Sequence, residues 1–270
     1  MNPRFQGTQQ LLGNEHFNRI REAHVLVVGL GGVGSWVVEG LARSGVGALT
    51  LVDGDEVCIT NVNRQIQALD SEIGRQKVTC LAERVRTLNP ECVVRERSEF
   101  FTRKTAAQIF DRPFTVVVDA IDSVESKRDL IALCVERGDA VVTVGSAGDR
   151  KDPSTIIVDD LASTIHDPLL QCIRKQLRQH FGFPKGARAR FGIPCVYAPL
   201  QRGDWRAERS CEVGANGRKT CNDGLGSAVY ITATMGFFAV AEVVKIITQE
   251  RQDCYAWRRH LADRAALLLP

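Results

Sequence analysis

The chain has 270 residues, 44% hydrophobic and 25% charged, which is typical of a soluble globular protein with one large α/β domain or two small ones. Residues 1–7 contain no apolar run, so no secretory signal is expected, and the longest apolar stretch, residues 228–241, is shorter than the roughly 20 residues of a stable membrane span. The net charge of +3 is uneven, because residues 168–220 carry 11 basic and 3 acidic side chains.

The first half of the chain alternates short apolar segments with amphipathic ones. Strands are predicted at residues 24–29, 48–53, 92–97, 114–120 and 140–144. Helices are predicted at residues 32–44, 73–88, 102–110 and 126–137. This alternation is typical of βαβ units, so we expect a doubly wound, mostly parallel α/β sheet of Rossmann-like type.

The pattern loosens in the second half. Further strands are predicted at residues 155–158 and 193–197, and further helices at residues 169–180 and 225–248. Between them, residues 181–192 are rich in Gly, Pro and Arg and are expected to form a flexible loop. With no internal repeat or linker, we expect one domain over residues 1–270. Its nucleotide-binding core would lie in residues 1–150, and residues 151–270 would form an elaborated C-terminal half.

A glycine-rich turn follows the first predicted strand and opens the first predicted helix. In the stretch VLVVGLGGVG, Gly29 would make the sharp turn and Gly31 and Gly32 would let the backbone approach a phosphate. Gly34 would let the helix pack on the strand, and the helix N-terminus would supply free N–H donors. The turn predicts a nucleotide site, but it suits a hydride-carrying dinucleotide and a triphosphate equally well.

The residues after the turn bear on that choice. Asp53 ends the second strand, where a carboxylate fits a ribose hydroxyl, as in a site for NAD. The next loop, however, contains Arg64, and Lys77 follows on the next helix. A triphosphate needs such cations more than a hydride-transfer site does. Asp122 follows the fourth strand, where a carboxylate could hold Mg²⁺ against phosphates.

These motifs carry a family resemblance over roughly residues 4–148. The segments GLGGVGSW, LVDGDEVCITNVNRQ, GRQK and DAIDS resemble the ubiquitin-activating-enzyme-like adenylyltransferases, the superfamily of ThiF and MoeB. The resemblance implies that ATP lies over the glycine turn and that a carboxylate is activated as an acyl-adenylate with release of pyrophosphate. The residues that it assigns to the nucleotide, its phosphates and its metal are Asp53, Asp55, Asn61, Arg64, Lys77 and Asp122. It also implies a homodimer in which Arg4, from the N-terminal arm of the partner subunit, completes the catalytic set.

A longer set of segments is similar to one branch of that superfamily, the tRNA threonylcarbamoyladenosine dehydratases. These segments are RFQGTQQLLG, TNVNRQIQAL, LNPECVV, VVDAIDSVESK, DLASTIHDPL and CNDGLGSAVYITATMGFFAV. The branch implies a cytoplasmic, ligase-type enzyme that adenylates the threonyl carboxylate of N6-threonylcarbamoyladenosine, next to the anticodon of a tRNA. The ureido group of the same side chain would then close a ring and release AMP. The tethered nucleophile needs little help from a protein nucleophile.

Under this resemblance, the basic segment at residues 168–220 is expected to bind tRNA. Its side chains could contact tRNA phosphates, and the aromatic residues among them could stack on an unstacked base. The basic residues are Arg174, Lys175, Arg178, Lys185, Arg188 and Arg190, continued by Arg202, Arg206, Arg209, Arg218 and Lys219. The aromatic residues are Phe181, Phe183, Phe191 and Trp205. The alternative is a solvated basic loop with core aromatics.

The nine cysteines include no CxxC pair, so we expect neither disulfides nor a zinc site. Relatives that handle sulfur use a cysteine as an acceptor, and Cys221 could be catalytic or could only position its loop. The resemblance also allows a sulfur-relay partner supplied by a cysteine desulfurase. Asp223 and Gly224 could line a site for a monovalent cation.

Three other functions stay open on the sequence. The chain could activate the C-terminus of a sulfur-carrier protein, although the zinc cysteines usual in those enzymes are missing. It could be a non-catalytic binding module, although the complete set from Asp53 to Asp122 argues against that. The last of these three alternatives is an NAD oxidoreductase.

Overall fold

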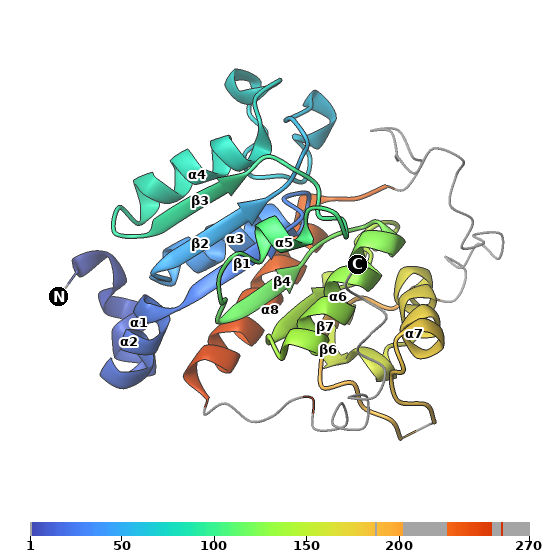
Figure 1. The fold of residues 1–270 in the computed structure, drawn as a ribbon. Coiled ribbons are helices and arrows are strands. Elements are labelled where there is room, and N and C mark those ends of the chain that lie inside the picture. Colours follow the sequence, from blue (N-terminus) through green and yellow to red (C-terminus); the bar gives the residue numbers. More distant parts are fainter. Residues whose placement is uncertain (1, 187, 202–225, 250–254, 256–270) are drawn as a thin grey trace.

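The computed structural model describes residues 2–186, 188–201, 226–249 and 255 (Figure 1). Within these residues, seven strands form one sheet in the order β3-β2-β1-β4-β5-β7-β6. The strands are β1 (His24–Val28), β2 (Ala48–Val52), β3 (Val93–Arg97), β4 (Val116–Asp119), β5 (Val141–Val144), β6 (Ile157–Asp160) and β7 (Pro194–Tyr197). Every pairing is parallel except that of β6 with β7. The predicted α/β class with a mostly parallel, Rossmann-like sheet is confirmed.

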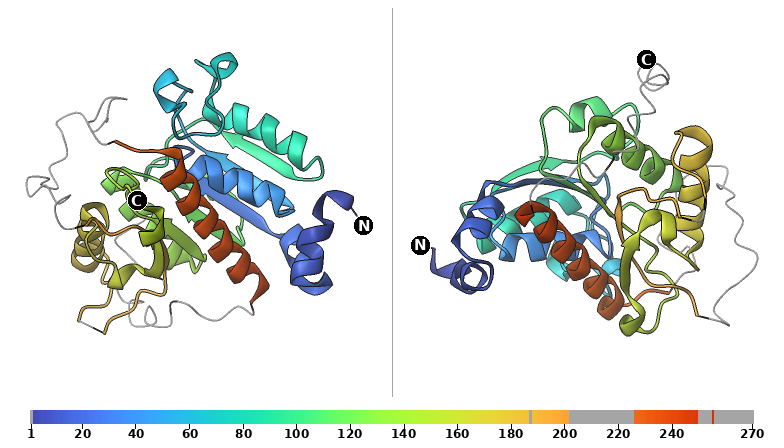
Figure 2. Two further views of the ribbon diagram at one scale, coloured as in Figure 1. Left: turned by 180° about the vertical axis from the view of Figure 1, so that it is seen from behind. Right: turned by 90° about the horizontal axis from the view of Figure 1, so that it is seen from below.

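Helices cover both faces of the sheet (Figure 2). One face is covered by α3 (Gly34–Arg43), α4 (Lys77–Leu88) and α8 (Val229–Thr248), and the other by α5 (Ala106–Ile109), α6 (Val124–Arg137) and α7 (Pro168–His180). Two short helices, α1 (Gln6–Leu12) and α2 (Asn14–Glu22), precede β1. Residues of β1 alternate between two cores, with Val25 and Val27 facing one and Leu26 and Val28 the other. This two-sided burial explains why the strand is apolar at every position from Val25 to Val28.

The sheet positions a ligand site at the carboxyl ends of its central strands. Going along the chain, strands are added from β1 outward through β2 and β3, and then from β4 on the other side of β1. The boundary between β1 and β4 is therefore the point where the strand order reverses, and doubly wound sheets bind their ligands beside that point. The glycine turn follows β1 there.

Some predicted elements are displaced in the structure, among them the helix predicted at residues 102–110, which is found only at Ala106–Ile109. The helix predicted from residue 73 begins only at Lys77, because Gly74 adopts a left-handed conformation with φ of +84° and breaks the helical path. The strand predicted at residues 155–158 is found at Ile157–Asp160. Asp152 caps a single turn over Pro153–Thr155 and delays the strand.

The N-terminal helices were not predicted, because their apolar signal is weak. Only Phe17 and Ile20 are buried in α2, and no residue is buried in α1. The helices are held at the edge where the strands begin, since Gly47 and Ala48 donate N–H to the carbonyl oxygens of Ile20 and Ala23.

α8 is long and apolar enough to cross a membrane, with a mean hydropathy of 1.6 over its most apolar window. It nevertheless packs across the sheet and against α3 as a core helix, and Ile231, Met235 and Ala239 are fully buried. The helix is therefore longer than the apolar stretch at residues 228–241 suggested, and it lies in the core of the described structure.

The flexible, base-stacking loop predicted at residues 181–192 needs correction. Its described residues form neither helix nor strand, but Phe183 and Phe191 are buried and contact each other edge to face at 4.9 Å. The guanidinium of Arg178 lies 5.2 Å from the ring centre of Phe191. Burial of these rings anchors the loop, so neither phenylalanine is available to a nucleobase.

Candidate nucleotide-binding site

The glycine turn is shaped by two positions that only glycine can occupy. Gly29 has φ of +88°, and a Cβ atom there would lie 2.8 Å from the carbonyl oxygen of Ala120. A Cβ atom at Gly34 would lie 1.8 Å from the carbonyl oxygen of Gly29. At Gly31, by contrast, a Cβ atom would meet nothing within 4 Å. The turn is thus closed against the protein on one side and open at Gly31, where backbone can approach a ligand.

Asp53 lies directly against this turn. Its carboxylate accepts the N–H of Leu30 at 2.6 Å and the N–H of Asp55 at 2.8 Å. Lys77 Nζ lies 2.8 Å from Asp55 and 3.9 Å from Asp53, and its side chain is only 7% exposed. Burial raises the pKa of Asp53, and the opposing pull of Lys77 and the two backbone amides does not fully offset it. The structure therefore brings Asp53, Asp55 and Lys77 together beside the turn.

Arg64 flanks the turn on the other side. A Cβ atom at Gly32 would lie 3.5 Å from Cδ of Arg64. The carbonyl oxygen of Arg64 accepts hydrogen bonds from Trp36 Nε1 at 3.0 Å and from Thr232 Oγ1 at 3.2 Å. Because these partners belong to α3 and α8, two helices fix the backbone of Arg64. Its guanidinium donates to the carbonyl oxygen of Thr60 at 2.7 Å.

Asn61 is 5% exposed and supports the loop from within. Its carboxamide oxygen accepts the N–H of Cys58 at 3.1 Å, which closes the short turn Ile59–Asn61. The backbone N–H of Arg64 in turn bonds to the carbonyl oxygen of Asn61 at 3.0 Å. In this structure, Asn61 fixes the turn from which Arg64 projects.

Asp122 is exposed, two residues after the segment that packs against the turn. Sequence reasoning missed the two buried charges behind it, Asp119 and Lys127, whose side chains form an ion pair at 2.8 Å. A signal was present, because Lys127 shares the apolar stripe of its helix with Leu130, Ile131 and Cys134 at helical spacing. A lysine on such a stripe predicts a buried acidic partner.

Arg4 lies far from the turn of its own chain. It is exposed in the short turn Pro3–Phe5, and the neighbouring Phe5 contacts Gly45 in the loop before β2. That loop precedes β2, whereas the glycine turn follows the parallel strand β1, so Arg4 and the turn lie at opposite ends of the strands.

The basic residues of the described segment fall into two groups. Arg174, Arg178 and Arg190 have protein partners, respectively Thr164 Oγ1, the carbonyl oxygen of Pro184 and the carboxylate of Asp159. Burial lowers the pKa of Arg174. Lys175, Lys185 and Arg188 are exposed, and Arg190 is exposed as well beside its surface partner. The exposed group is better placed for an external partner.

Several predicted residues lie outside the part that the structure describes. They are Cys221, Asp223, Gly224, Trp205, Arg202, Arg206, Arg209, Arg218 and Lys219. Among the described residues, no group of three or more His, Cys, Asp or Glu side chains is arranged to hold a metal ion.

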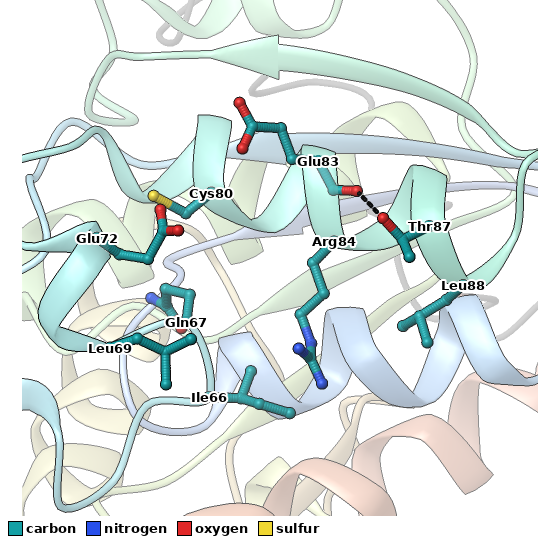
Figure 3. Close-up of a pocket in the computed structure, with 9 residues that line it drawn as sticks. All are labelled: Ile66, Gln67, Leu69, Glu72, Cys80, Glu83, Arg84, Thr87 and Leu88. Atoms are coloured by element: carbon teal, nitrogen blue, oxygen red, sulfur yellow. Dashed lines mark hydrogen bonds between the residues drawn. The ribbon is translucent and has the colours of Figure 1, made fainter.

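A hollow of about 230 Å³ lies beside α4, on the flank of the site (Figure 3). Apolar Ile66, Leu69 and Leu88 line it together with Glu72, Glu83 and Arg84. It connects to the turn through Gln67, whose Nε2 donates to the carbonyl oxygen of Leu30 at 3.1 Å. The cations and carboxylates at the open side of the turn do not line this hollow.

Comparisons with known proteins agree with this fold. The profile of the ThiF family matches residues 6–265. The tRNA threonylcarbamoyladenosine dehydratase of Escherichia coli K12 is 43% identical over 248 residues, covering 90% of this chain and 92% of that protein. The Haemophilus influenzae protein of the same name is 40% identical over 92% of this chain and 94% of its own. The crystal structure of E. coli TcdA in complex with ATP superposes with a TM-score of 0.79 at 41% identity, covering 90% of this chain and 93% of that one.

Proposed function

The chain belongs to the ThiF family, and on that premise we propose that it is an ATP-dependent dehydratase of N6-threonylcarbamoyladenosine in tRNA. One observation carries the proposal. Asp53, Arg64 and Lys77 surround an open glycine turn in a chain that is 43% identical to a tRNA threonylcarbamoyladenosine dehydratase over nearly its whole length. A triphosphate would fit this cradle, because a Cβ atom at Gly31 meets nothing within 4 Å, Arg64 lies beside Gly32, and Lys77 lies beside Asp53.

The reaction has two steps. In the first, an oxygen of the threonyl carboxylate attacks the α-phosphorus of ATP, and the bond to pyrophosphate breaks. In the second, the ureido group of the same nucleoside attacks the activated carbonyl, and AMP leaves with the carboxylate oxygen. The net change is loss of one water from the nucleoside, driven by ATP cleavage. Because nucleophile and electrophile are joined, their effective concentration is high.

The protein contributes mainly by holding charge in place. Arg64 and Lys77 stabilise the negative charge that builds on the phosphates as pyrophosphate departs. Asp53 accepts a hydrogen bond from a ribose hydroxyl of ATP, and the N–H groups at the start of α3 face the phosphates. Lys77 can leave Asp55 for a phosphate at little cost, since Asp55 is 54% exposed and loses little on returning to water.

Mg²⁺ is part of the proposal, and Asp122 is the residue that would hold it. An exposed carboxylate at the end of a parallel strand suits a hard cation that keeps most of its water. When bound, the ion would neutralise charge on the triphosphate.

A homodimer is also proposed. Arg4 lies at the opposite end of the strands from the glycine turn of its own chain, which supports a role in the partner's site, as the family resemblance implies. The outer face of α8 provides an apolar surface for association, with Val229, Tyr230, Phe237 and Phe238 each at least 40% exposed. Apolar surface concentrated in this way is typical of interfaces between proteins.

The tRNA would bind through exposed cations of the C-terminal half. Lys175, Lys185 and Arg188 are the described residues we assign to its phosphates, and we place the enzyme in the cytoplasm with its substrates. Arg174 and Arg178 would have to exchange part-buried partners for phosphates, so they are weaker candidates, whereas Arg190 would leave only a surface pair with Asp159. Cys221, a monovalent cation and a sulfur-relay partner stay predictions of the sequence.

One assay tests the function. The protein is incubated with ATP, Mg²⁺ and tRNA carrying threonylcarbamoyladenosine, and both AMP and the mass of the digested nucleoside are measured. We expect AMP in step with loss of one water from the nucleoside, and no AMP with tRNA that lacks the threonylcarbamoyl group. Formation of AMP only with a sulfur-carrier protein would instead support the alternative adenylyltransferase.

A further inference from the structure

Lys127 and Asp119 form an ion pair in which both side chains are completely buried. Lys127 Nζ lies 2.8 Å from Asp119 Oδ2, and each side chain has a relative exposure of 0%. Removing two charges from water costs several kcal/mol per ion, which their attraction seldom exceeds. Stability alone is therefore a poor reason for such a pair, and its contacts suggest another use.

Both members of the pair hold the same peptide segment. Lys127 Nζ donates to the carbonyl oxygen of Ile121 at 2.9 Å, and Asp119 Oδ1 accepts the N–H of Ile121 at 3.2 Å. Thr143 Oγ1 on β5 donates to the second carboxylate oxygen of Asp119 at 2.6 Å. Both backbone polar groups of Ile121 are thus fixed by one buried ion pair, which β5 also holds.

The other side of the segment rests on the glycine turn. Ala120 donates its N–H to the carbonyl oxygen of Val28 at 2.9 Å, and it would lie 2.8 Å from a Cβ atom at Gly29. The chain between β4 and α6 is therefore held by the turn at Ala120 and by the ion pair at Ile121. The next residue is Asp122, which is exposed.

We propose that Lys127 is a positioning residue for the adenylation step, because its ion pair with Asp119 fixes the backbone of Ile121 and thereby aims the carboxylate of Asp122 at the triphosphate. The proposal rests on the proposed function, since it requires Asp122 to act on bound ATP. Lys127 itself is buried and touches no substrate. Without its charge, Asp119 would be left as an uncompensated buried anion, and Ile121 would lose the donor to its carbonyl oxygen.

A double-mutant cycle tests whether Lys127 acts through Asp122. The rate of AMP formation with modified tRNA is measured for wild type, Lys127→Met, Asp122→Asn and the double variant. We expect Lys127→Met to lower kcat by about 30-fold while KM for ATP changes less than about threefold, since the glycine turn and Asp53 are intact. In the Asp122→Asn background the same change should cost less than about threefold. Losses that multiply in the double variant, or a Lys127→Met variant with wild-type kcat, would overturn the proposal.

Further variants separate positioning from folding. Lys127→Arg keeps the charge and should recover part of kcat, which a simple loss of folded protein would not predict. Thr143→Val keeps both charges and removes only the hydroxyl that holds Asp119, so the same cycle can be run with it if Lys127→Met does not fold. Arg103→Met is the matched control, because it breaks a 2.8 Å ion pair with Asp129, which lies on α6 as Lys127 does. Arg103 is 58% exposed, so this variant should leave kcat unchanged.

The two hypotheses fail in different ways. A wild-type protein that makes no AMP with the modified tRNA overturns the proposed function, and the role of Lys127 with it. A wild-type protein that turns over, while the Lys127 and Asp122 losses multiply, overturns only the positioning role.

Discussion

The backbone N–H of Leu30 donates to the carboxylate of Asp53 at 2.6 Å, which ties the end of β2 to the glycine turn after β1. Asp53 therefore shapes the turn before any nucleotide binds. The same carboxylate is the residue proposed for the ribose of ATP. One side chain thus links the conformation of the phosphate cradle to the recognition of the sugar.

Replacing Asp53 should weaken ATP binding more than it slows turnover. Asp53→Asn keeps only one acceptor oxygen for the N–H groups of Leu30 and Asp55, and one of them would lose its partner. The ribose hydroxyl of ATP also loses its bond to a charged acceptor, which is worth about 1.5–3 kcal/mol, so the Kd for ATP should rise by about 10- to 100-fold. Calorimetric titration with ATP measures this. Asp55→Asn, at a 54% exposed side chain, should weaken binding much less; equal losses in the two variants would contradict the role of Asp53.

Two glycines of the turn should respond in opposite ways to alanine. Gly31→Ala adds a methyl group where nothing lies within 4 Å, so the melting temperature should stay near that of wild type while ATP affinity falls. Gly34→Ala drives the methyl group to 1.8 Å from the carbonyl oxygen of Gly29 and should destabilise the fold itself. Thermal unfolding with and without ATP separates the two effects. If Gly31→Ala bound ATP as wild type does, the triphosphate could not lie over the turn at this residue.

Arg64→Ala should lower kcat by about 10²- to 10³-fold, the usual cost of removing one group that stabilises charge in a transition state. KM for ATP should change less, because the turn and Asp53 are untouched. Single-turnover formation of AMP is the measurement. Arg86→Ala removes an arginine paired with Glu96 in the last turn of α4 and is the matched control. Equal rates for the two variants would remove Arg64 from the site.

The sequence predicted the site better than the surface around it. The glycine spacing, Asp53 and Lys77 could be placed from residue types, because parallel strands bring their carboxyl ends to one edge. The exact start of α4 was missed, since one glycine with positive φ overrode a helical apolar pattern at Ile73. Local conformation of this kind leaves little trace in periodicity.

The basic segment shows a different limit. Sequence gives the number of cations but not their partners, and Arg174, Arg178 and Arg190 proved to be held by the protein itself. Phe183 and Phe191 were equally compatible with a core and with a base-stacking surface until their burial was known. The Lys127–Asp119 pair was missed because its partners lie on different elements, even though the lysine breaks an apolar stripe.

Mixing two inactive variants should restore activity if Arg4 serves the partner's site. In a mixed dimer of Arg4→Ala and Arg64→Ala chains, one site regains both arginines and the other lacks both. Random exchange between equal amounts of the two variants makes half of the dimers mixed. Each mixed dimer has one complete site out of two, so about a quarter of wild-type activity should return. The mixture is assayed after subunit exchange, with each variant alone as the control. Activity that stays at the level of the single variants would mean that Arg4 does not act across a dimer.

The ion pairs of Glu39 should make stability fall in acid. Glu39 is 4% exposed on α3, and its carboxylate accepts from Arg84 Nε at 2.6 Å and from Arg43 Nε at 2.7 Å. Burial alone would raise the pKa of Glu39, but the two arginines outweigh it and hold the pKa below the ordinary value of 4.5. The unfolded chain therefore takes up this proton first as the pH falls. The stabilisation is complete above pH 4.5 and is lost as the pH falls through the lower, folded-state pKa.

Glu39→Gln isolates this contribution from other groups, including Asp53, whose raised pKa acts in the opposite direction. At pH 7 the free energy of unfolding of the variant should be about 1–3 kcal/mol lower than that of wild type, which is the cost of weakened hydrogen bonds to charged groups. Below pH 4.5 the difference in free energy of unfolding between wild type and variant should narrow, because protonation of Glu39 then removes from wild type the charged interaction that the variant already lacks. Urea unfolding at several pH values gives both curves. Glu15→Gln, at a side chain 77% exposed and paired with Arg19, should show almost no gap at any pH. A gap for Glu39→Gln that stays constant into acid would mean that its two arginines do not depress the pKa.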